Sequence, residues 1–227
     1  MFAIPVAISA QAKTGPDYDP KAKTILDGVS ATAKSYQSIT ATFTVTMEKP
    51  DKTKDVKEGS VILKGNMYKI SLENKVKEKV YHEEYYNDGK TVWVYNEKDK
   101  EATIDDAPDP AKKKNDSQIS PTEIFTIHEK GFKYKFIKEE VQGGKTVQLI
   151  DLYPEQPDKK NYHTVHITID KVKKQIVSVV FVNKDQSKTT YTVKTFTPNI
   201  AYTDATFKFD CKTHPGVSCV DLRTGDE

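Results

Sequence analysis

The chain has 227 residues, of which 36% are hydrophobic and 30% charged, and its formal net charge is +2. This near-neutral balance excludes a strongly basic nucleic-acid-binding protein. Arg223 is the only arginine, so the side chain best suited to phosphate and guanine recognition is nearly missing. Aromatic residues make up 10% of the chain, which favours a folded protein over a disordered one.

The first residues have the pattern of an export signal. An apolar run from Phe2 to Ala10 leads into the small-x-small sequence Ala10-Gln11-Ala12, after which the chain turns polar. We expect residues 1–12 to be a signal-peptide remnant, with a frayed or strand-forming N-terminal segment as the alternative. Residues 13–227 are then expected to form a single domain in an exported compartment.

The two cysteines, Cys211 and Cys219, flank the turn-forming sequence His214-Pro215-Gly216. An even number of cysteines in an exported chain is typical of a disulfide, so we expect these two to be joined. Two separate buried thiols are the alternative. A metal site is disfavoured because only His214 is nearby as a third ligand.

Two helices are predicted. The first begins at Asp19-Pro20, which supplies a preferred N-cap and a proline at the first helical position, and ends near Ser38. Its apolar stripe has helical spacing and consists of Ala22, Ile25, Leu26, Val29, Ala33 and Tyr36. The second covers residues 120–130, where Ser120-Pro121-Thr122-Glu123 forms a capping box and Gly131 ends the helix.

Elsewhere hydrophobic and polar residues alternate with the two-residue period of β-strands. About ten strands are predicted, at residues 39–48, 56–63, 67–72, 76–85, 91–95, 133–140, 146–153, 162–170, 175–183 and 189–196, and Phe207 and Phe209 alternate at the end. Short turns such as Asp88-Gly89 join them, which favours an antiparallel sheet that curls at this size. The predicted fold is mainly β: one curved antiparallel sheet forming an unclosed barrel, with the helices on its concave side.

Motifs for catalysis are weak. Gly89-Lys90-Thr91 and Gly144-Lys145-Thr146 resemble the end of a phosphate-binding loop, but a strand rather than a helix follows each. His163 and His166 stand three residues apart in a strand, so their rings point to opposite faces, which disfavours a shared metal ion. We expect no catalytic site, no metal and no cofactor; a secreted enzyme with an unrecognised site is the weakest alternative.

A curved sheet with more apolar surface than two helices can cover predicts a cavity for an apolar ligand. The candidate lining residues are Phe43, Val45, Tyr68, Ile70, Leu72, Trp93, Phe125 and Ile127. For each of them an ordinary place in the core is the alternative.

Several segments in this order resemble the LolA family of periplasmic lipoprotein carriers. The most specific are the hairpin Asn87–Asn96, which is similar to the family's Asp-Gly-x-x-x-Trp-x-Tyr pattern, and the closing segment Gly216–Arg223. Less specific matches are the first strand at Ile39–Thr44, the segment Glu58–Lys64 and the segment Met67–Ile70. The resemblance covers nearly the whole exported chain by order of elements.

This resemblance implies an unclosed barrel with a helical lid and a periplasmic, monomeric, non-enzymatic carrier. Such a carrier takes the acyl chains of lipoproteins from an inner-membrane ABC exporter and passes them to an outer-membrane acceptor, either a protein or the membrane itself. A regulatory sensor that binds lipid or lipoprotein on the same fold is the alternative.

One part of the family pattern is absent. Family members have an Arg-Pro pair after the second barrel strand, and that arginine holds the lid by hydrogen bonds to helix backbone. Here the corresponding stretch is Lys64-Gly65-Asn66, which makes Lys64 the candidate for the lid contact. The family's neighbouring cavity aromatic corresponds to Tyr68. Because lysine lacks the planar fork of arginine, we expect a weaker latch and a lid held by Ile124, Phe125 and Ile127.

Overall fold

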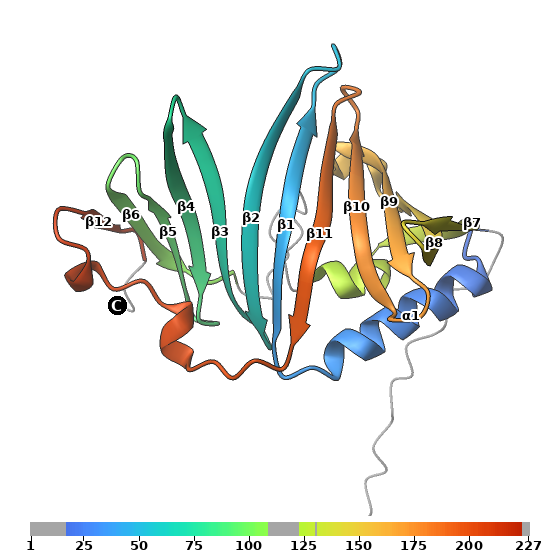
Figure 1. The fold of residues 1–227 in the computed structure, drawn as a ribbon, viewed down its shortest axis with the longest axis horizontal. Helices are drawn as coiled ribbons and strands as arrows, with labels where there is room; N and C mark the ends of the chain where they lie inside the picture. The colour runs from blue at the N-terminus through green and yellow to red at the C-terminus, as the bar shows by residue number, and fades with distance from the viewer. Residues whose placement is uncertain (1–16, 109–122, 130, 224–227) are drawn as a thin grey trace, which may run out of the picture.

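The computed structural model describes residues 17–108, 123–129 and 131–223 (Figure 1). The expected signal-peptide remnant lies outside these ranges. So does the first part of the expected capping box, at residues 120–122.

Twelve strands of the described chain form one sheet, in the order β12-β6-β5-β4-β3-β2-β1-β11-β10-β9-β8-β7. They are β1 (Ile39–Glu48), β2 (Lys54–Lys64), β3 (Met67–Val76), β4 (Lys79–Asn87), β5 (Thr91–Asn96), β6 (Glu101–Asp106), β7 (Phe132–Gln142), β8 (Lys145–Pro154), β9 (Tyr162–Asp170), β10 (Gln175–Asn183), β11 (Lys188–Pro198) and β12 (Ser218–Asp221). Every neighbouring pair is antiparallel except β12 with β6, which is parallel. The end strands β7 and β12 lie at opposite sides of Figure 1, so the sheet is unclosed, as predicted.

Helix α1 (Pro20–Lys34) begins where the sequence predicts. The Asp19 side chain accepts hydrogen bonds from the backbone N–H groups of Lys21 and Ala22, at 2.8 and 3.2 Å. The second Asp19 oxygen accepts from the backbone N–H of Phe136 at 3.0 Å, which ties the start of the helix to β7. These hydrogen bonds therefore fix the start of the helix on the sheet, in addition to the packing of its apolar stripe.

The main core lies between α1, η1 (Glu123–Glu129) and strands β7 to β10. η1 is a 3₁₀ helix rather than the α-helix expected for this region. Fully buried residues from β8 and β9 fill the centre, namely Ile150, Leu152, Val165 and Ile167, and α1 adds Ala22, Leu26 and Val29. Both helices therefore cover the same face of the sheet, as expected, and we call this the inner face.

The strand predictions need three corrections. β6 and β12 were not expected, although both are short strands of the sheet. The expected strand at 76–85 begins later, because Val76 ends β3 and pairs with Lys79 across a two-residue turn in which Lys77 has a φ of +57°. The alternation of Phe207 and Phe209 does not mark a strand: Phe207 ends the 3₁₀ helix η3 (Asp204–Phe207).

Two further 3₁₀ helices are η2 (Pro157–Lys159), after β8, and η4 (Cys211–Thr213), before β12. Within the described residues, no helix is both long enough and apolar enough to cross a membrane.

Candidate functional site

The inner face has a second half that neither α1 nor η1 covers. Strand register places residues on one face, because directly paired residues of an antiparallel ladder point the same way. Val45 pairs with Tyr191, Tyr191 with Val179, and Val179 with the core residue Ile167, so the odd-numbered residues of β1 near Val45 lie on the inner face.

The same register continues across the uncovered strands. One row of paired residues runs Ala41, Val61, Ile70, Tyr85 and Val94, from β1 to β5. The neighbouring rows contain Phe43 and Leu72, on either side of Gly59, and Leu63 and Tyr68. We define the open half of the inner face by its half-buried residues Phe43, Val61, Tyr68, Ile70, Leu72, Tyr85 and Val94.

This open half differs from the covered half in exposure. The core residues of β8 and β9 named above are at most 1% exposed, whereas the apolar residues of β2, β3 and β5 on the open half remain half-buried. Two hollows lie outside the open half: one of about 550 Å³ is lined by Ile62, Lys69 and Tyr86, and one of about 390 Å³ lies between the far ends of β2 and β3. A continuous apolar surface of this kind is typical of a site for an apolar ligand or partner.

Phe43 lies over β2 because position 59 has no side chain. A Cβ built on Gly59 would stand 2.7 Å from Cζ of Phe43 and 2.9 Å from Cδ2 of Leu72. Both distances are shorter than a van der Waals contact, so any side chain at position 59 would clash with Phe43 and Leu72. Glycine is therefore needed for the ring of Phe43 to lie beside Leu72 of β3. Alternation along the chain predicts inner-face positions for Phe43 and Leu72, but the role of Gly59 depends on the strand register.

A series of aromatic rings connects the two halves of the inner face. The ring of Phe43 is 6.4 Å from that of Tyr191, which is 6.1 Å from that of Phe181. Phe181 is in turn 5.2 Å from Tyr162, whose ring belongs to the main core. Tyr191 and Phe181 were not among the predicted lining residues, although both occupy alternating positions of predicted strands.

One polar group sits within the open half. The Tyr85 hydroxyl donates a hydrogen bond to Glu83, and the Asn74 amide donates to the other Glu83 oxygen at 3.4 Å. Burial and the bond to Glu83 both raise the pKa of Tyr85 above its ordinary value. Tyr85 therefore stays neutral and presents its ring to the apolar surface.

Phe125 and Ile127 do not join this surface. Ile127 is 3% exposed within the main core, and Phe125 packs against the same core. Polar contacts also fix η1 to α1: the Ser30 hydroxyl donates to the Phe125 carbonyl at 2.5 Å, and the buried His128 ring lies 3.1 Å from Asp27. Burial alone would raise the pKa of Asp27, but the hydrogen bonds from Lys23 and His128 together outweigh it, so the pKa is lowered.

Trp93 was expected at the cavity and lies on the opposite, outer face. It pairs with Tyr86, and both belong to a separate cluster with Ala102, Phe209 and the two cysteines. The prediction failed because residues 92–95 are apolar at every position, so alternation alone could not assign the faces.

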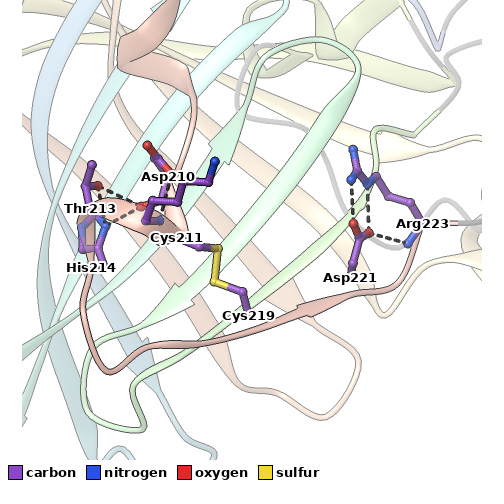
Figure 2. The surroundings of a disulfide bond; sticks show 8 residues. Asp210, Cys211, Thr213, His214, Cys219, Asp221 and Arg223 are labelled. Carbon is purple, nitrogen blue, oxygen red and sulfur yellow. Dashed lines mark hydrogen bonds and ion pairs between the residues drawn. A yellow bond between two sulfur atoms is a disulfide. The ribbon is translucent and has the colours of Figure 1, made fainter.

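The C-terminal segment covers this outer cluster. Phe209 stacks on Tyr95 with ring centroids 4.7 Å apart, and Cys211 and Cys219 form the predicted disulfide, with their Cα atoms 6.4 Å apart. Figure 2 shows this bond joining η4 to β12, with the sole arginine paired to Asp221 nearby. That contact lowers the pKa of Asp221 to about 2.

The hydrogen bonds of Lys64 within the described residues lie in the C-terminal segment and not at η1, the described part of the expected lid. Its ammonium donates to the Tyr202 carbonyl at 3.0 Å and to Asp204 at 2.8 Å. It therefore holds the C-terminal segment, because Lys64 ends β2 beside the start of η3. Arg223, paired with Asp221, is likewise engaged in the C-terminal segment.

Metal-ligating side chains do not gather at one place within the described residues. None of their His, Cys, Asp or Glu side chains form a group of three or more that could hold a metal ion. The inner face provides instead an apolar surface next to a well-packed core. The Tyr85–Glu83 hydrogen bond is the polar feature of this surface described above.

Comparison with known proteins agrees with this geometry. The family model described as outer membrane lipoprotein carrier protein LolA matches residues 34–210, while a search of curated proteins gave no match. A solved structure of an uncharacterized conserved protein from Thermus thermophilus has a TM-score of 0.57 at 13% identity, covering 90% of this chain and 99% of that one. At this identity the likeness supports the fold alone.

Two further solved structures are more distant. A putative outer membrane lipoprotein-sorting protein domain from Vibrio parahaemolyticus is 11% identical, with a TM-score of 0.46 and coverage of 82% and 96%. LprF from Mycobacterium bovis is 13% identical, with a TM-score of 0.47 and the same coverage. Because the family model spans most of the sequence, from the end of α1 to the residue before η4, the chain belongs to the outer membrane lipoprotein carrier protein LolA family.

Proposed function

We propose that this protein is a periplasmic carrier, not an enzyme, and that it binds the acyl chains of lipoproteins on the open half of the inner face. In this proposal residues 13–227 act as one monomeric domain. The protein receives its cargo from an inner-membrane ABC exporter and delivers it to an outer-membrane acceptor, a protein or the membrane itself.

The observation that supports this proposal is the uncovered apolar surface of β2, β3 and β5. Exposing an acyl chain to water costs about 0.8 kcal/mol for each CH₂ group, so a chain crossing an aqueous compartment needs a protein surface to cover it. Val61, Ile70 and Leu72 are half-buried on such a surface. Membership of the carrier family supports the same proposal.

The chain offers a matched pair of isoleucines for the test. Ile70 is on the open half of the inner face, whereas Ile62 lies on the adjacent strand and lines a hollow on the outer face. We expect Ile70→Lys to weaken binding of a fluorescent fatty acid by about tenfold or more, since it places a charge where the apolar chain packs. Ile62→Lys is expected to leave the affinity within about twofold of the unmodified protein.

Binding alone does not define a carrier, so the second measurement is transfer. The loaded protein is mixed with acceptor vesicles, and movement of a fluorescent lipopeptide to the vesicles is followed. Delivery supports the carrier proposal. Tight binding without delivery contradicts it and favours a lipid-responsive regulator on the same fold. Loss of binding in both isoleucine variants would contradict the assignment of the site.

A further inference from the structure

Strands β2 and β3 separate along part of their length. Their ladder runs only from Lys64–Met67 to Gly59–Leu72. Beyond it, residues 54–58 pair with β1 and residues 73–76 pair with β4, but within the described chain neither segment has a strand on its other side. Figure 1 shows the two hairpins, β1–β2 and β3–β4, diverging toward their tips.

A hollow of about 390 Å³ lies in this gap. Its charged lining combines three lysines with three carboxylates: Lys57, Lys75, Lys98, Asp55, Glu73 and Asp99. This balanced lining does not suit an acyl chain, which needs an apolar wall, or an anionic lipid surface, which needs an excess of lysine. It suits a polar polypeptide that carries both signs of charge.

The edges of the gap favour an extended polypeptide. Two strand segments each present backbone N–H and C=O groups that the sheet does not use, and such edges bind extended peptides by strand addition. Charged side chains alternate along both edges: Asp55 and Lys57 on β2, and Glu73 and Lys75 on β3. They would lie beside the side chains of the added strand.

The gap also continues the open half of the inner face. The last paired residues before the strands separate are Gly59 and Leu72, and these are the residues next to the ring of Phe43. The apolar surface and the polar gap are therefore continuous. Together they match a molecule in which an apolar anchor is followed by a polar extended chain.

We propose that the gap between β2 and β3 holds the extended polypeptide that follows the acylated residue of the cargo. This inference rests on the proposed carrier function and adds to it a second, peptide-binding subsite. The acyl chains lie on the open half of the inner face, and the first residues of the polypeptide leave the protein through the gap as an added strand.

The test uses a thiol dye in the gap. Both native cysteines are in the disulfide, so a single introduced cysteine takes the label. An environment-sensitive dye is attached to Val76→Cys, in the gap, and in a control protein to Val172→Cys, an 85% exposed valine outside it. The probes are palmitic acid and a palmitoylated ten-residue peptide of serine, lysine and glutamate, with displacement of a fluorescent fatty acid measured in parallel.

We expect both probes to displace the fatty acid, but only the lipopeptide to shift the emission of the dye at position 76. Neither probe should affect the dye at position 172. A lipopeptide with N-methyl groups at alternate peptide bonds should bind about fivefold or more weakly, because it cannot donate to one of the two strand edges.

Other outcomes overturn the inference. If the lipopeptide displaces the fatty acid but leaves the dye at position 76 unchanged, the peptide subsite is wrong and the carrier proposal stands. The same conclusion follows if palmitic acid shifts that dye equally, or if N-methylation has no effect. If neither probe displaces the fatty acid, the carrier proposal fails together with this inference.

Discussion

Gly59 sets the packing of the open half of the inner face at the level of single atoms. The ring of Phe43 occupies the space where a side chain at position 59 would begin, and the same space borders Leu72. Because Gly59 of β2 has no side chain, the side chains of Phe43 on β1 and Leu72 on β3 can form one apolar surface across it.

We predict that Gly59→Ala destabilises the protein by about 1–3 kcal/mol, the usual cost of adding a methyl group to a filled site. It should also weaken fatty-acid binding, since the ring of Phe43 must move. The measurement is urea unfolding of a double-mutant cycle with Phe43→Leu, whose smaller side chain should relieve much of the cost. Additive effects of the two substitutions would show that the ring and the methyl group do not compete.

Trp93 gives a second prediction for a single residue. It packs in the outer cluster with Phe209 and the disulfide, on the face opposite the open half. We expect reduction of the disulfide to change the tryptophan fluorescence strongly, whereas saturation with a non-fluorescent fatty acid should change it little. Binding that altered Trp93 as much as reduction does would place the ligand on the outer face.

At the scale of elements, polar contacts as well as apolar packing hold η1 on α1. Asp27 of α1 lies beside Lys23 and the buried His128, and the ring of Tyr134 from β7 packs edge-on against the His128 ring. Since the pKa of Asp27 is lowered in the folded protein, its carboxylate adds stability at pH values above its ordinary pKa of about 3.9. That contribution is lost as the pH falls through the folded-state value.

We therefore predict that Asp27→Asn lowers the free energy of unfolding at about pH 5, and that the difference from the unmodified protein shrinks as the pH falls below the ordinary carboxyl pKa of about 3.9. Chemical unfolding at a series of pH values measures this difference. Asp158→Asn, at an exposed position of η2, serves as the control and should show no such trend. A difference that stayed constant with pH would mean that the effect of Asp27 is not electrostatic.

The elements themselves could largely be predicted from sequence, and the exceptions have physical causes. The capped start of α1 and the alternating strands follow local rules that the chain obeys. β12 is four residues long and pairs in parallel with a strand far away in sequence, so no local pattern marks it. The turn between β3 and β4 uses Lys77 at positive φ, where glycine or asparagine is the usual signal.

Over the whole molecule, the sequence predicts an apolar inner face but not which half of it stays uncovered. Phe43, Val45, Tyr68, Ile70 and Leu72 share the inner face, as the regular alternation along β1 and β3 indicates. Phe125 and Ile127 were grouped with them because the second predicted helix was expected to lie on the concave side of the sheet. Their place over β7 to β10 depends on where the chain carries η1, which is a tertiary property without a local signal.

This division predicts two levels of stability within one sheet. Strands β8 and β9 contribute residues that are at most 1% exposed and pack in one core with α1, whereas β3 and β5 have half-buried residues on the inner face and lie outside the part that α1 and η1 cover. Amide hydrogens exchange through local opening, whose free energy rises with the number of buried apolar contacts. We therefore expect exchange to be slowest in β8 and β9 and faster in β3 and β5.

Cargo should remove much of this difference. An acyl chain on the open half adds apolar contacts to β3 and β5, and a ligand that binds only the folded state suppresses opening in proportion to its occupancy. Hydrogen exchange with and without saturating fatty acid should show slower exchange in β3 and β5 and little change in β8 and β9, and Ile70→Lys should abolish the effect. Protection confined to β8 and β9 would place the ligand in the main core, and equal protection everywhere would indicate a global stabilisation without a local site.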